Sequence, residues 1–390
     1  MSSPLAPQFA FAACQHGAEA VLKTDLAKRA PTWRPAFSRP GFVTFKNEQP
    51  VTKLDGFQLS SAFARTSGLS LGSVEGETPA ELAAAVWQLP EVAAARATVR
   101  LIDWHVWQRD VVAPGERGFE PGPTPASQEA EAALRAAAPE DFPEVAPGPH
   151  VTPRNRWVLD VIVVEPNHWW VGCHYSASRP ACWPGGVPPI ELPEHAVSRA
   201  YLKMSEALWW SALPASRGEQ VVELGCAPGG ASQALLDAGL LVIGVDPARV
   251  AVELQENPLF QHVCRRVSEA PRSLFKEARW LTADMNVAPA YTLDAVESVV
   301  TQPGMHVRGM LLTLKLPEWQ LVEELPNYLA RIQSWGYRDV RVRQLAFNRQ
   351  ELCVAALRSR GQRRVQRESR RRPRQRADDR HSTPPKPLGE

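Results

Sequence analysis

Hydrophobic runs in the second half of the chain alternate with segments of helical periodicity. Short apolar runs predict strands at Gln220–Leu224, Leu240–Val245, Trp280–Ala283 and Met310–Leu316. Helices are predicted between them, at Ala231–Ala238, Leu293–Val300 and Trp319–Trp335. This alternation is typical of an α/β fold in which helices cover both faces of a mostly parallel sheet. Two final runs, Val340–Ala346 and Leu352–Leu357, predict an antiparallel hairpin with a short turn at the sheet edge.

The first half of the chain predicts two smaller units. Residues 1–52 read as an α+β unit, with strands at Phe9–Cys14 and Gly41–Lys46 and a helix at Gly17–Ala30. Residues 53–185 form a second unit, with strands at Ala97–Trp104 and Trp157–Val164. This unit is interrupted by residues 114–153, which hold nine prolines. Because such a segment buries little apolar surface, we expect a disordered insertion there.

Composition narrows the class of protein. The 390 residues are 44% hydrophobic and 22% charged, which indicates packed globular domains. The longest apolar runs are too short to span a bilayer, and no secretory signal is recognisable at the N-terminus, so we expect a cytoplasmic protein. The six cysteines form no CxxC pair, which argues against a metal site or a disulfide framework.

The net charge of +2 conceals an asymmetry between the body and the C-terminal end. Residues 358–390 hold 11 Arg and one Lys against four acidic residues, whereas the rest of the chain has more acidic than basic groups. Such a tail is typically disordered and often contacts nucleic acid. A solvated tail without a specific role fits the composition equally well.

The strongest local motif is a glycine-rich turn between a predicted strand and a helix. The strand Val221–Leu224 runs into Gly225-Cys226-Ala227-Pro228-Gly229-Gly230, and Asp246 ends the next predicted strand. Glycines allow a ligand to approach the backbone, and a carboxylate at this distance can accept hydrogen bonds from both ribose hydroxyls of a nucleoside cofactor. The proline breaks the GxGxxG spacing of a dinucleotide site, so the pattern favours S-adenosylmethionine over NAD.

Three charged residues occupy positions where the pattern calls for apolar ones. Asp284 follows one predicted strand, Lys315 lies near the end of another, and Glu351 precedes the last. The carboxyl ends of parallel strands form the active-site rim of such a sheet, and a lysine within a leucine-rich strand needs a carboxylate partner. Lys203 lies in a predicted helix, Ser198–Glu206, that leads into the sheet.

These residues resemble the Lys-Asp-Lys-Glu set of the FtsJ-like ribose 2′-O-methyltransferases. The segments SRAYLKMSEAL, ELGCAPGG, VDPA, ADM, LKLP and NRQEL occur in the order of that family. The chain is more closely similar to the M-type methyltransferases of large-subunit (23S) ribosomal RNA, which act on a cytidine. It departs from them in Glu223, where an aspartate is usual, in CAPGG for ACPGG, and in the lack of a clear adenine-contacting acid near Val267, Ser268 and Glu269.

The resemblance implies a fold, a reaction and a set of residues. The fold is a Rossmann-like methyltransferase domain, residues 186–357, preceded by a ferredoxin-like unit (1–52) and a THUMP-like RNA-binding domain (53–185). The reaction is S-adenosylmethionine-dependent 2′-O-methylation of a ribose in large-subunit ribosomal RNA. The catalytic set would be Lys315 as general base with Lys203, Asp284 and Glu351, and the cofactor would lie against Ser198, Glu223, Gly225, Ala227, Pro228, Gly229, Gly230, Asp246 and Asp284.

Two other functions remain open at this stage. A non-catalytic RNA-binding or ribosome-assembly factor with a vestigial methyltransferase fold would share the sheet, although the intact four-residue set argues against it. A small-molecule methyltransferase would need neither the long N-terminal half nor the basic tail. The sequence does not identify the modified nucleotide, the maturation stage of the RNA or the oligomeric state.

Overall fold

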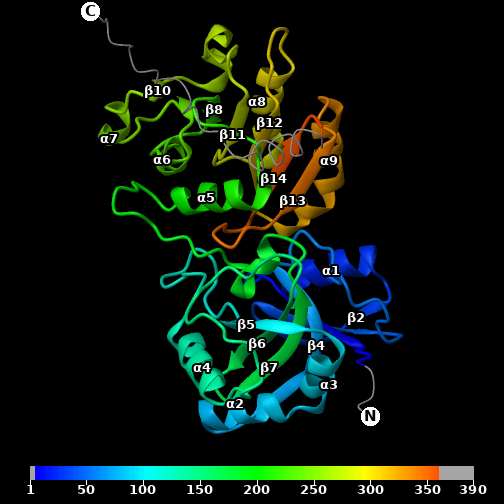
Figure 1. The fold of residues 1–390 in the computed structure, drawn as a ribbon. Helices are drawn as coiled ribbons and strands as arrows, with labels where there is room; N and C mark the ends of the chain where they lie inside the picture. Colours follow the sequence, from blue (N-terminus) through cyan, green and yellow to red (C-terminus); the bar gives the residue numbers. More distant parts are fainter. Residues whose placement is uncertain (1–4, 360–390) are drawn as a thin grey trace, which may run out of the picture.

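The computed structural model describes residues 5–359 and contains two seven-stranded sheets. Each sheet forms the core of one lobe, and in Figure 1 the N-terminal lobe lies below the C-terminal lobe. The residues predicted as an Arg-rich tail lie, from position 360 onward, outside the described part. Among the described helices, none combines the length and the hydropathy needed to cross a bilayer.

The N-terminal sheet has the strand order β2-β3-β1-β4-β7-β6-β5. Its strands are β1 (Phe9–Ala13), β2 (Trp33–Arg39), β3 (Phe42–Asn47), β4 (Thr66–Glu75), β5 (Leu101–Gln108), β6 (Trp157–Glu165) and β7 (His168–Tyr175). All neighbours are antiparallel except β5 and β6. Because β1 pairs with both β3 and β4, the division predicted at residue 52 falls within one continuous sheet. The ferredoxin-like and THUMP-like identities of its two parts stay predictions.

Four helices belong to this lobe: α1 (Glu19–Arg29), α2 (Pro79–Gln88), α3 (Pro90–Thr98) and α4 (Pro125–Ala136). The strand predicted at Ala97–Trp104 begins later, as β5, because the preceding alanine-rich segment has high helix propensity and forms α3.

The expectation that residues 114–153 are disordered is wrong, because they contain helix α4. Thr124 and Ser127 form a reciprocal capping box at its start, and Pro125 occupies the first turn, where a missing N–H costs no hydrogen bond. Ala130 and Leu134 are buried in the same hydrophobic cluster as Trp104. The prolines therefore flank the helix instead of interrupting it, and one apolar face suffices to hold it against the lobe.

The C-terminal sheet has the strand order β10-β9-β8-β11-β12-β14-β13. Its strands are β8 (Gln220–Leu224), β9 (Leu241–Val245), β10 (Phe260–Val263), β11 (Trp280–Ala283), β12 (Gly309–Lys315), β13 (Asp339–Arg343) and β14 (Glu351–Leu357). The first five strands of this order are parallel, and β14 and β13 are antiparallel at the edge. The predicted edge hairpin is therefore confirmed, but its connection is long, because β13 ends at Arg343 and β14 starts at Glu351.

Helices cover both faces of the C-terminal sheet. They are α5 (Ala200–Ser211), α6 (Gly230–Asp237), α7 (Val252–Gln255), α8 (Pro289–Val300) and α9 (Leu325–Ser334), with short 3-10 helices at Val267–Glu269, Arg272–Phe275 and Trp319–Glu324. Leu293 of α8 and Ile332 of α9 are buried in the cluster on one face, and Met204 of α5 and Leu235 of α6 in the cluster on the other. The mixed α/β class predicted from the alternating pattern is thus present in this half.

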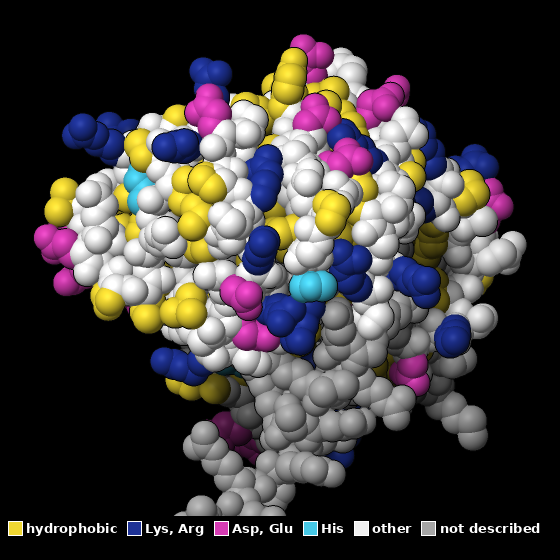
Figure 2. Space-filling model, turned by 90° about the horizontal axis from the view of Figure 1, so that it is seen from above, with side chains coloured by type: hydrophobic (Ala, Val, Ile, Leu, Met, Phe, Trp, Pro, Cys, Tyr) yellow, Lys and Arg dark blue, Asp and Glu magenta, His cyan; other side chains and the backbone are white. Residues whose placement is uncertain are grey.

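The surface of the C-terminal lobe is mixed in charge. Figure 2 shows Lys and Arg side chains interspersed with acidic and hydrophobic ones over the face seen from above.

Candidate active site

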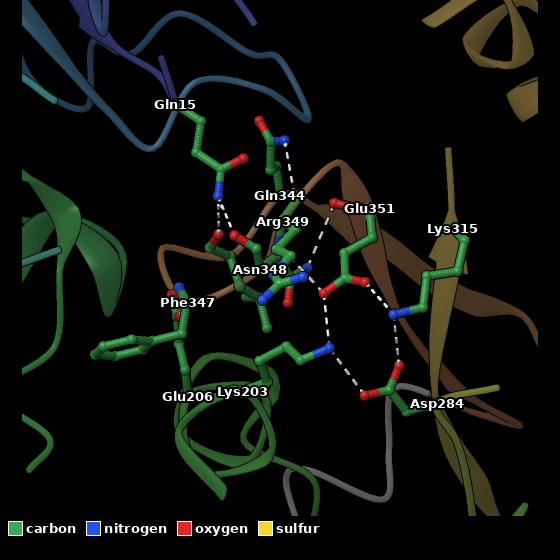
Figure 3. A network of polar contacts seen from close by, with 11 residues as sticks. Gln15, Lys203, Glu206, Asp284, Lys315, Gln344, Phe347, Asn348, Arg349 and Glu351 are labelled. Carbon is green, nitrogen blue, oxygen red and sulfur yellow. Dashed lines mark hydrogen bonds and ion pairs between the residues drawn. The ribbon is translucent and has the colours of Figure 1, made fainter. Parts of the chain in front are cut away.

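Two lysines and two carboxylates form a closed ring of alternating charges (Figure 3). The Nζ atom of Lys203 lies 2.9 Å from Asp284 Oδ2 and 2.8 Å from Glu351 Oε1. The Nζ atom of Lys315 lies 3.2 Å from Asp284 Oδ1 and 2.5 Å from Glu351 Oε2. Each charged group therefore bridges two groups of opposite charge, and the ring has no net charge when all four are ionised.

Strand order explains why these residues meet. Asp284 follows β11 and Lys315 ends β12, and these two strands are parallel neighbours whose carboxyl ends share one edge. Glu351 begins the antiparallel strand β14 and lies directly opposite Lys315 in the β12–β14 register. Lys203 reaches the same edge from α5, which packs on one face of the sheet. The sequence predicted the membership of this group, and the fold brings all four members together.

Burial and charge act against each other in the ring. Burial would raise the pKa of Asp284, but Lys203 and Lys315 outweigh it and hold that pKa below its usual value. Burial would lower the pKa of Lys203, but Asp284 and Glu351 together raise it, so Lys203 stays protonated at neutral pH. The Lys315 side chain is 24% exposed, against 18% for Lys203 and 1% for Glu351. Lys315 is thus the basic group of the ring with more access to solvent.

The glycine-rich turn lies directly beside this ring. Gly225 has a φ of +81°, and a Cβ atom there would stand 3.0 Å from the backbone oxygen of Asp284. A Cβ on Gly230 would collide with Ser198. These two positions therefore require glycine, which holds the turn after β8 close to both segments. The predicted residues Ser198, Gly225 and Gly230 thus lie around one turn.

Asp246 closes this turn from the end of β9. Its Oδ2 accepts a hydrogen bond from the backbone N–H of Ala227 at 3.1 Å, and its Oδ1 accepts one from Ala248 at 2.8 Å. Each carboxylate oxygen can accept a further bond, so the side chain can hold a ligand hydroxyl while it fixes the loop. The sequence located this acid correctly, although its bonds to the loop follow only from the fold.

Glu223 on β8 is a buried acid with an unused oxygen. Its side chain is nearly inaccessible, and the Ser232 hydroxyl donates to Oε2 at 2.5 Å, whereas Oε1 has no hydrogen-bond partner among the described residues. Burial, with a further contribution from Asp284 and Asp246, raises the pKa of Glu223 to about 8. A buried carboxyl of this kind would be stabilised as an anion by a cationic ligand group.

A pocket of about 640 Å³ opens next to the turn. Its lining includes Gly225 and Asp246 on one side and Met285 and Asn286, which follow the ring residue Asp284, on another. Val267 and Ser268, from the region where the sequence shows no clear adenine-contacting acid, also line it, together with Tyr291 of α8. The pocket therefore lies between the glycine turn and the segment that follows the ring residue Asp284.

The fold also gathers three histidines and two aspartates that the sequence analysis did not single out. Asp103, His105 and His150 form one group that could hold a metal ion, and His105, Asp160 and His174 form another. Asp103 and His105 alternate along β5, which was the only signal available in advance, whereas His150 comes from a distant loop. The expectation that the chain holds no metal site rested on the spacing of its cysteines and did not take histidine and aspartate ligands into account.

Hydrogen bonds already saturate two of these histidines. His174 lies against Asp160 Oδ2 at 2.5 Å and the Ala181 carbonyl at 2.7 Å, so both of its ring nitrogens face acceptors. His150 likewise faces Asp103 and the Gly148 carbonyl. Burial would lower the pKa of His174, but Asp160 raises it overall. Each of these two rings thus lies against an aspartate with both nitrogens already in hydrogen bonds.

Comparison with known protein families gives a match within the second half of the chain. The family model described as FtsJ-like methyltransferase matches residues 196–324. This segment is similar to the FtsJ-like methyltransferases. It contains the glycine turn and three members of the charged ring, while Glu351 lies beyond it. The resemblance stated from the sequence motifs is therefore confirmed for this part.

Curated relatives agree with the family match. The chain is 32% identical over 190 residues to the ribosomal RNA large subunit methyltransferase M of Pseudomonas putida (strain KT2440), and 31% identical over 190 residues to that of Pseudomonas fluorescens (strain Pf-5). Each match covers 45% of this chain and 52% of the relative, so the chain spans about half the length of the curated relatives it matches. The solved structure of TrmN from Thermus thermophilus covers 90% of this chain and 99% of its own, at 16% identity and a TM-score of 0.34, which is too low to carry an argument.

Proposed function

We propose that this protein transfers a methyl group from S-adenosylmethionine to a ribose 2′-hydroxyl in large-subunit ribosomal RNA, with a cytidine as target. The observation that carries the proposal is the closed Lys203–Asp284–Lys315–Glu351 ring beside the glycine turn. The FtsJ-like match and the relatives named as ribosomal RNA large subunit methyltransferases support the reaction class and the substrate. The choice of ribose oxygen and of cytidine rests on the family resemblance.

The residues around the pocket fit S-adenosylmethionine. This cofactor carries a positively charged amino group and a sulfonium. Asp246 lines the pocket, and Asp284 precedes the lining residue Met285. Glu223, two residues before the lining residue Gly225, has a buried oxygen without a hydrogen-bond partner among the described residues. Asp246 would accept the ribose hydroxyls, while Ser198, Gly225, Ala227, Pro228, Gly229 and Gly230 would surround the methionine end. The turn is too crowded for side chains at Gly225 and Gly230, which suits a ligand that lies directly on the backbone.

Lys315 is the group that we assign as general base. When bound, S-adenosylmethionine supplies an activated methyl group, so the protein must align the hydroxyl and remove its proton. Lys315 ends a rigid, buried strand, and its partly exposed amine can meet a hydroxyl at the edge of the sheet. The reaction requires Lys315 as the neutral amine, so its ammonium group must first release a proton to solvent. Asp284 and Glu351 then stabilise the positive charge that returns when the amine takes the proton of the hydroxyl.

Lys203 has a different role in the proposed reaction. Its raised pKa keeps it charged, so it does not act as a base. It lies between Asp284 and Glu351 and prevents the two carboxylates from repelling each other. Both carboxylates can therefore stay ionised at the distances that Lys315 requires.

The N-terminal half would bring the RNA to this site. We keep the ferredoxin-like unit (1–52) and the THUMP-like domain (53–185) as proposals, with the methyltransferase domain at 186–357 and the basic tail from 358. Ribosomal RNA as substrate also implies a cytoplasmic location. No step of the proposed reaction requires a metal ion.

One experiment tests the reaction and its alternatives. The full chain is incubated with methyl-labelled S-adenosylmethionine and with ribosomal RNA from cells that lack the gene, and the RNA is then digested to nucleosides. We expect label in 2′-O-methylcytidine from the large-subunit RNA. Tight RNA binding without any transfer would instead identify a non-catalytic assembly factor, and label in a base would exclude the ribose hydroxyl as acceptor.

A further inference from the structure

The connection between β13 and β14, residues 344–350, is held by the N-terminal lobe. The Gln15 side chain, which follows β1, donates from Nε2 to the carbonyl of Asn348 and, at 3.4 Å, to that of Leu345. The backbone N–H of Gln344 donates to the Ala62 carbonyl at 2.7 Å. Gln15 is 2% exposed, so its two bonds lie in the interior and join parts of the chain that are more than 300 residues apart.

The same connection is held from the other side by α5. Both carboxylate oxygens of Glu206, which is fully buried, accept backbone N–H bonds, from Ala346 at 2.9 Å and from Phe347 at 3.0 Å. Glu206 lies three residues after Lys203 on this helix, so the two side chains are neighbours on its surface. One helix therefore carries both a member of the charged ring and the anchor of the 344–350 connection (Figure 3).

The connection in turn determines where Glu351 lies. The Asn348 side chain donates to the Glu351 carbonyl at 3.4 Å, and the Arg349 backbone N–H donates to the Glu351 carboxylate at 3.3 Å. This carboxylate contacts both lysines, as Asp284 does, but it is the less exposed of the two carboxylates. A shift of the connection would therefore move Glu351 relative to Lys203 and Lys315.

We propose that Gln15 and Glu206 are positioning residues that act through residues 344–350 to hold the Glu351 carboxylate against both lysines. This inference rests on the proposed function, and it makes the N-terminal lobe part of the catalytic geometry as well as a platform for RNA. Misplacement of a reacting group by about 1 Å can slow a reaction roughly 100-fold, so a small displacement of Glu351 suffices to be measured.

Two substitutions remove the anchors with little change in side-chain volume. Glu206→Gln replaces one acceptor oxygen by an NH2 group that opposes a backbone N–H, and Gln15→Met removes the donor to two carbonyls. Matched controls are Glu253→Gln and Gln302→Met, whose exposed side chains form no hydrogen bond within residues 5–359. If Glu206→Gln does not fold, Gln15→Met carries the test.

The test combines hydrogen exchange with kinetics on the full-length protein. We expect exchange of the peptide spanning 344–352 to be at least about tenfold faster in both variants, because buried bonds that close this segment are lost. We expect single-turnover methyl transfer to fall by about tenfold or more, with the dissociation constant for S-adenosylmethionine unchanged. In a Glu351→Gln background, Glu206→Gln should cause no further loss, because the anchor acts through Glu351.

Three results would overturn the inference while leaving the proposed function intact, provided that the wild-type protein is active. The first is unchanged hydrogen exchange in this peptide, and the second is faster exchange together with an unchanged rate of methyl transfer. The third is a further fall in the rate of methyl transfer when Glu206→Gln is added to Glu351→Gln. A wild-type protein that transfers no methyl group would overturn the proposed function itself, and the role of Gln15 and Glu206 with it.

Discussion

Lys315 and Glu351 are directly opposed residues of the antiparallel strands β12 and β14, and their charged groups meet at 2.5 Å. Side chains in this relationship share one face of a sheet, and their Cβ atoms are separated by about 5 Å. The lysine is thereby held by two rigid strands and not by a loop. A base positioned in this way needs little reorganisation when its substrate arrives.

Loss of Lys315 should abolish methyl transfer while cofactor binding persists. Lys315→Ala removes the base, and Lys315→Arg should also fail because a guanidinium does not release its proton at accessible pH. Single-turnover transfer to undermethylated ribosomal RNA, with S-adenosylmethionine affinity measured in parallel, tests both variants. The exposed Lys276→Ala serves as control. Retention of more than about a tenth of the wild-type rate in Lys315→Ala would remove Lys315 as base, since general-base catalysis typically supplies 10²–10⁴-fold.

Asp246→Ala should weaken S-adenosylmethionine binding about tenfold or more, because hydrogen bonds to a charged acceptor contribute about 1.5–3 kcal/mol each. In the wild type the Asp246 carboxylate accepts hydrogen bonds from the backbone N–H groups of Ala227 and Ala248. The variant leaves both N–H groups without this acceptor. Calorimetric titration measures the affinity, and thermal unfolding checks that the fold persists. Asp55→Ala, at an exposed acid in the N-terminal lobe, should leave the affinity unaltered. Equal affinities in the two variants would exclude Asp246 from the cofactor site.

Ionisation of the buried Glu223 should lower the free energy of unfolding as pH rises from acidic to mildly alkaline values. Burial raises its pKa to about 8 in the fold, whereas an unfolded glutamate titrates near 4.3. Because the pKa of Glu223 is higher in the folded state than in the unfolded state, its contribution to the free energy of unfolding is fully present below about pH 4.3. That contribution is lost as pH rises through about 8. Glu223→Gln, which stays neutral, should therefore lose less stability over this window than the wild type. Thermal unfolding at pH 5 and pH 8.5 measures the difference, and parallel curves for the two proteins would contradict it.

Chelation should leave the fold of the N-terminal lobe unchanged. His150 and His174 each have both ring nitrogens in hydrogen bonds, to Asp103 and Asp160 and to backbone carbonyls, so neither ring needs a cation as a partner. Unfolding temperatures with and without EDTA, together with elemental analysis of the purified protein, test this prediction. A stoichiometric metal whose removal lowers the unfolding temperature would show instead that Asp103, His105 and His150 are ligands.

Removal of the basic tail should reduce the salt dependence of RNA binding. The tail holds 11 Arg and one Lys, and contacts between such groups and phosphates release counterions without reading sequence. A chain truncated after Leu357 should bind ribosomal RNA with a shallower dependence on salt and should bind S-adenosylmethionine as before. An identical salt slope for both proteins would show that the tail does not contact the RNA.

The sequence by itself predicted the strands of the C-terminal sheet other than β10, which had no expected counterpart, and the membership of the charged ring. Strand, glycine turn and helix follow one another within about 25 residues at Val221–Asp246, and such local patterns reflect chain periodicity and backbone sterics. Lys315 stood out because a charge within a leucine-rich strand needs a partner. That partner was predicted as a carboxylate, and the fold supplies two of them.

Only the tertiary structure decided the features that depend on contacts between distant segments. The Pro-rich segment forms α4 because an apolar helix face finds the N-terminal core, which composition alone does not reveal. The expected short turn before β14 is a long connection, because Gln15 and Glu206 take up its backbone groups. Gln15 is separated from Leu345 by 330 positions in the chain. No local pattern encodes such a pairing, since it exists only once both lobes have folded and packed together.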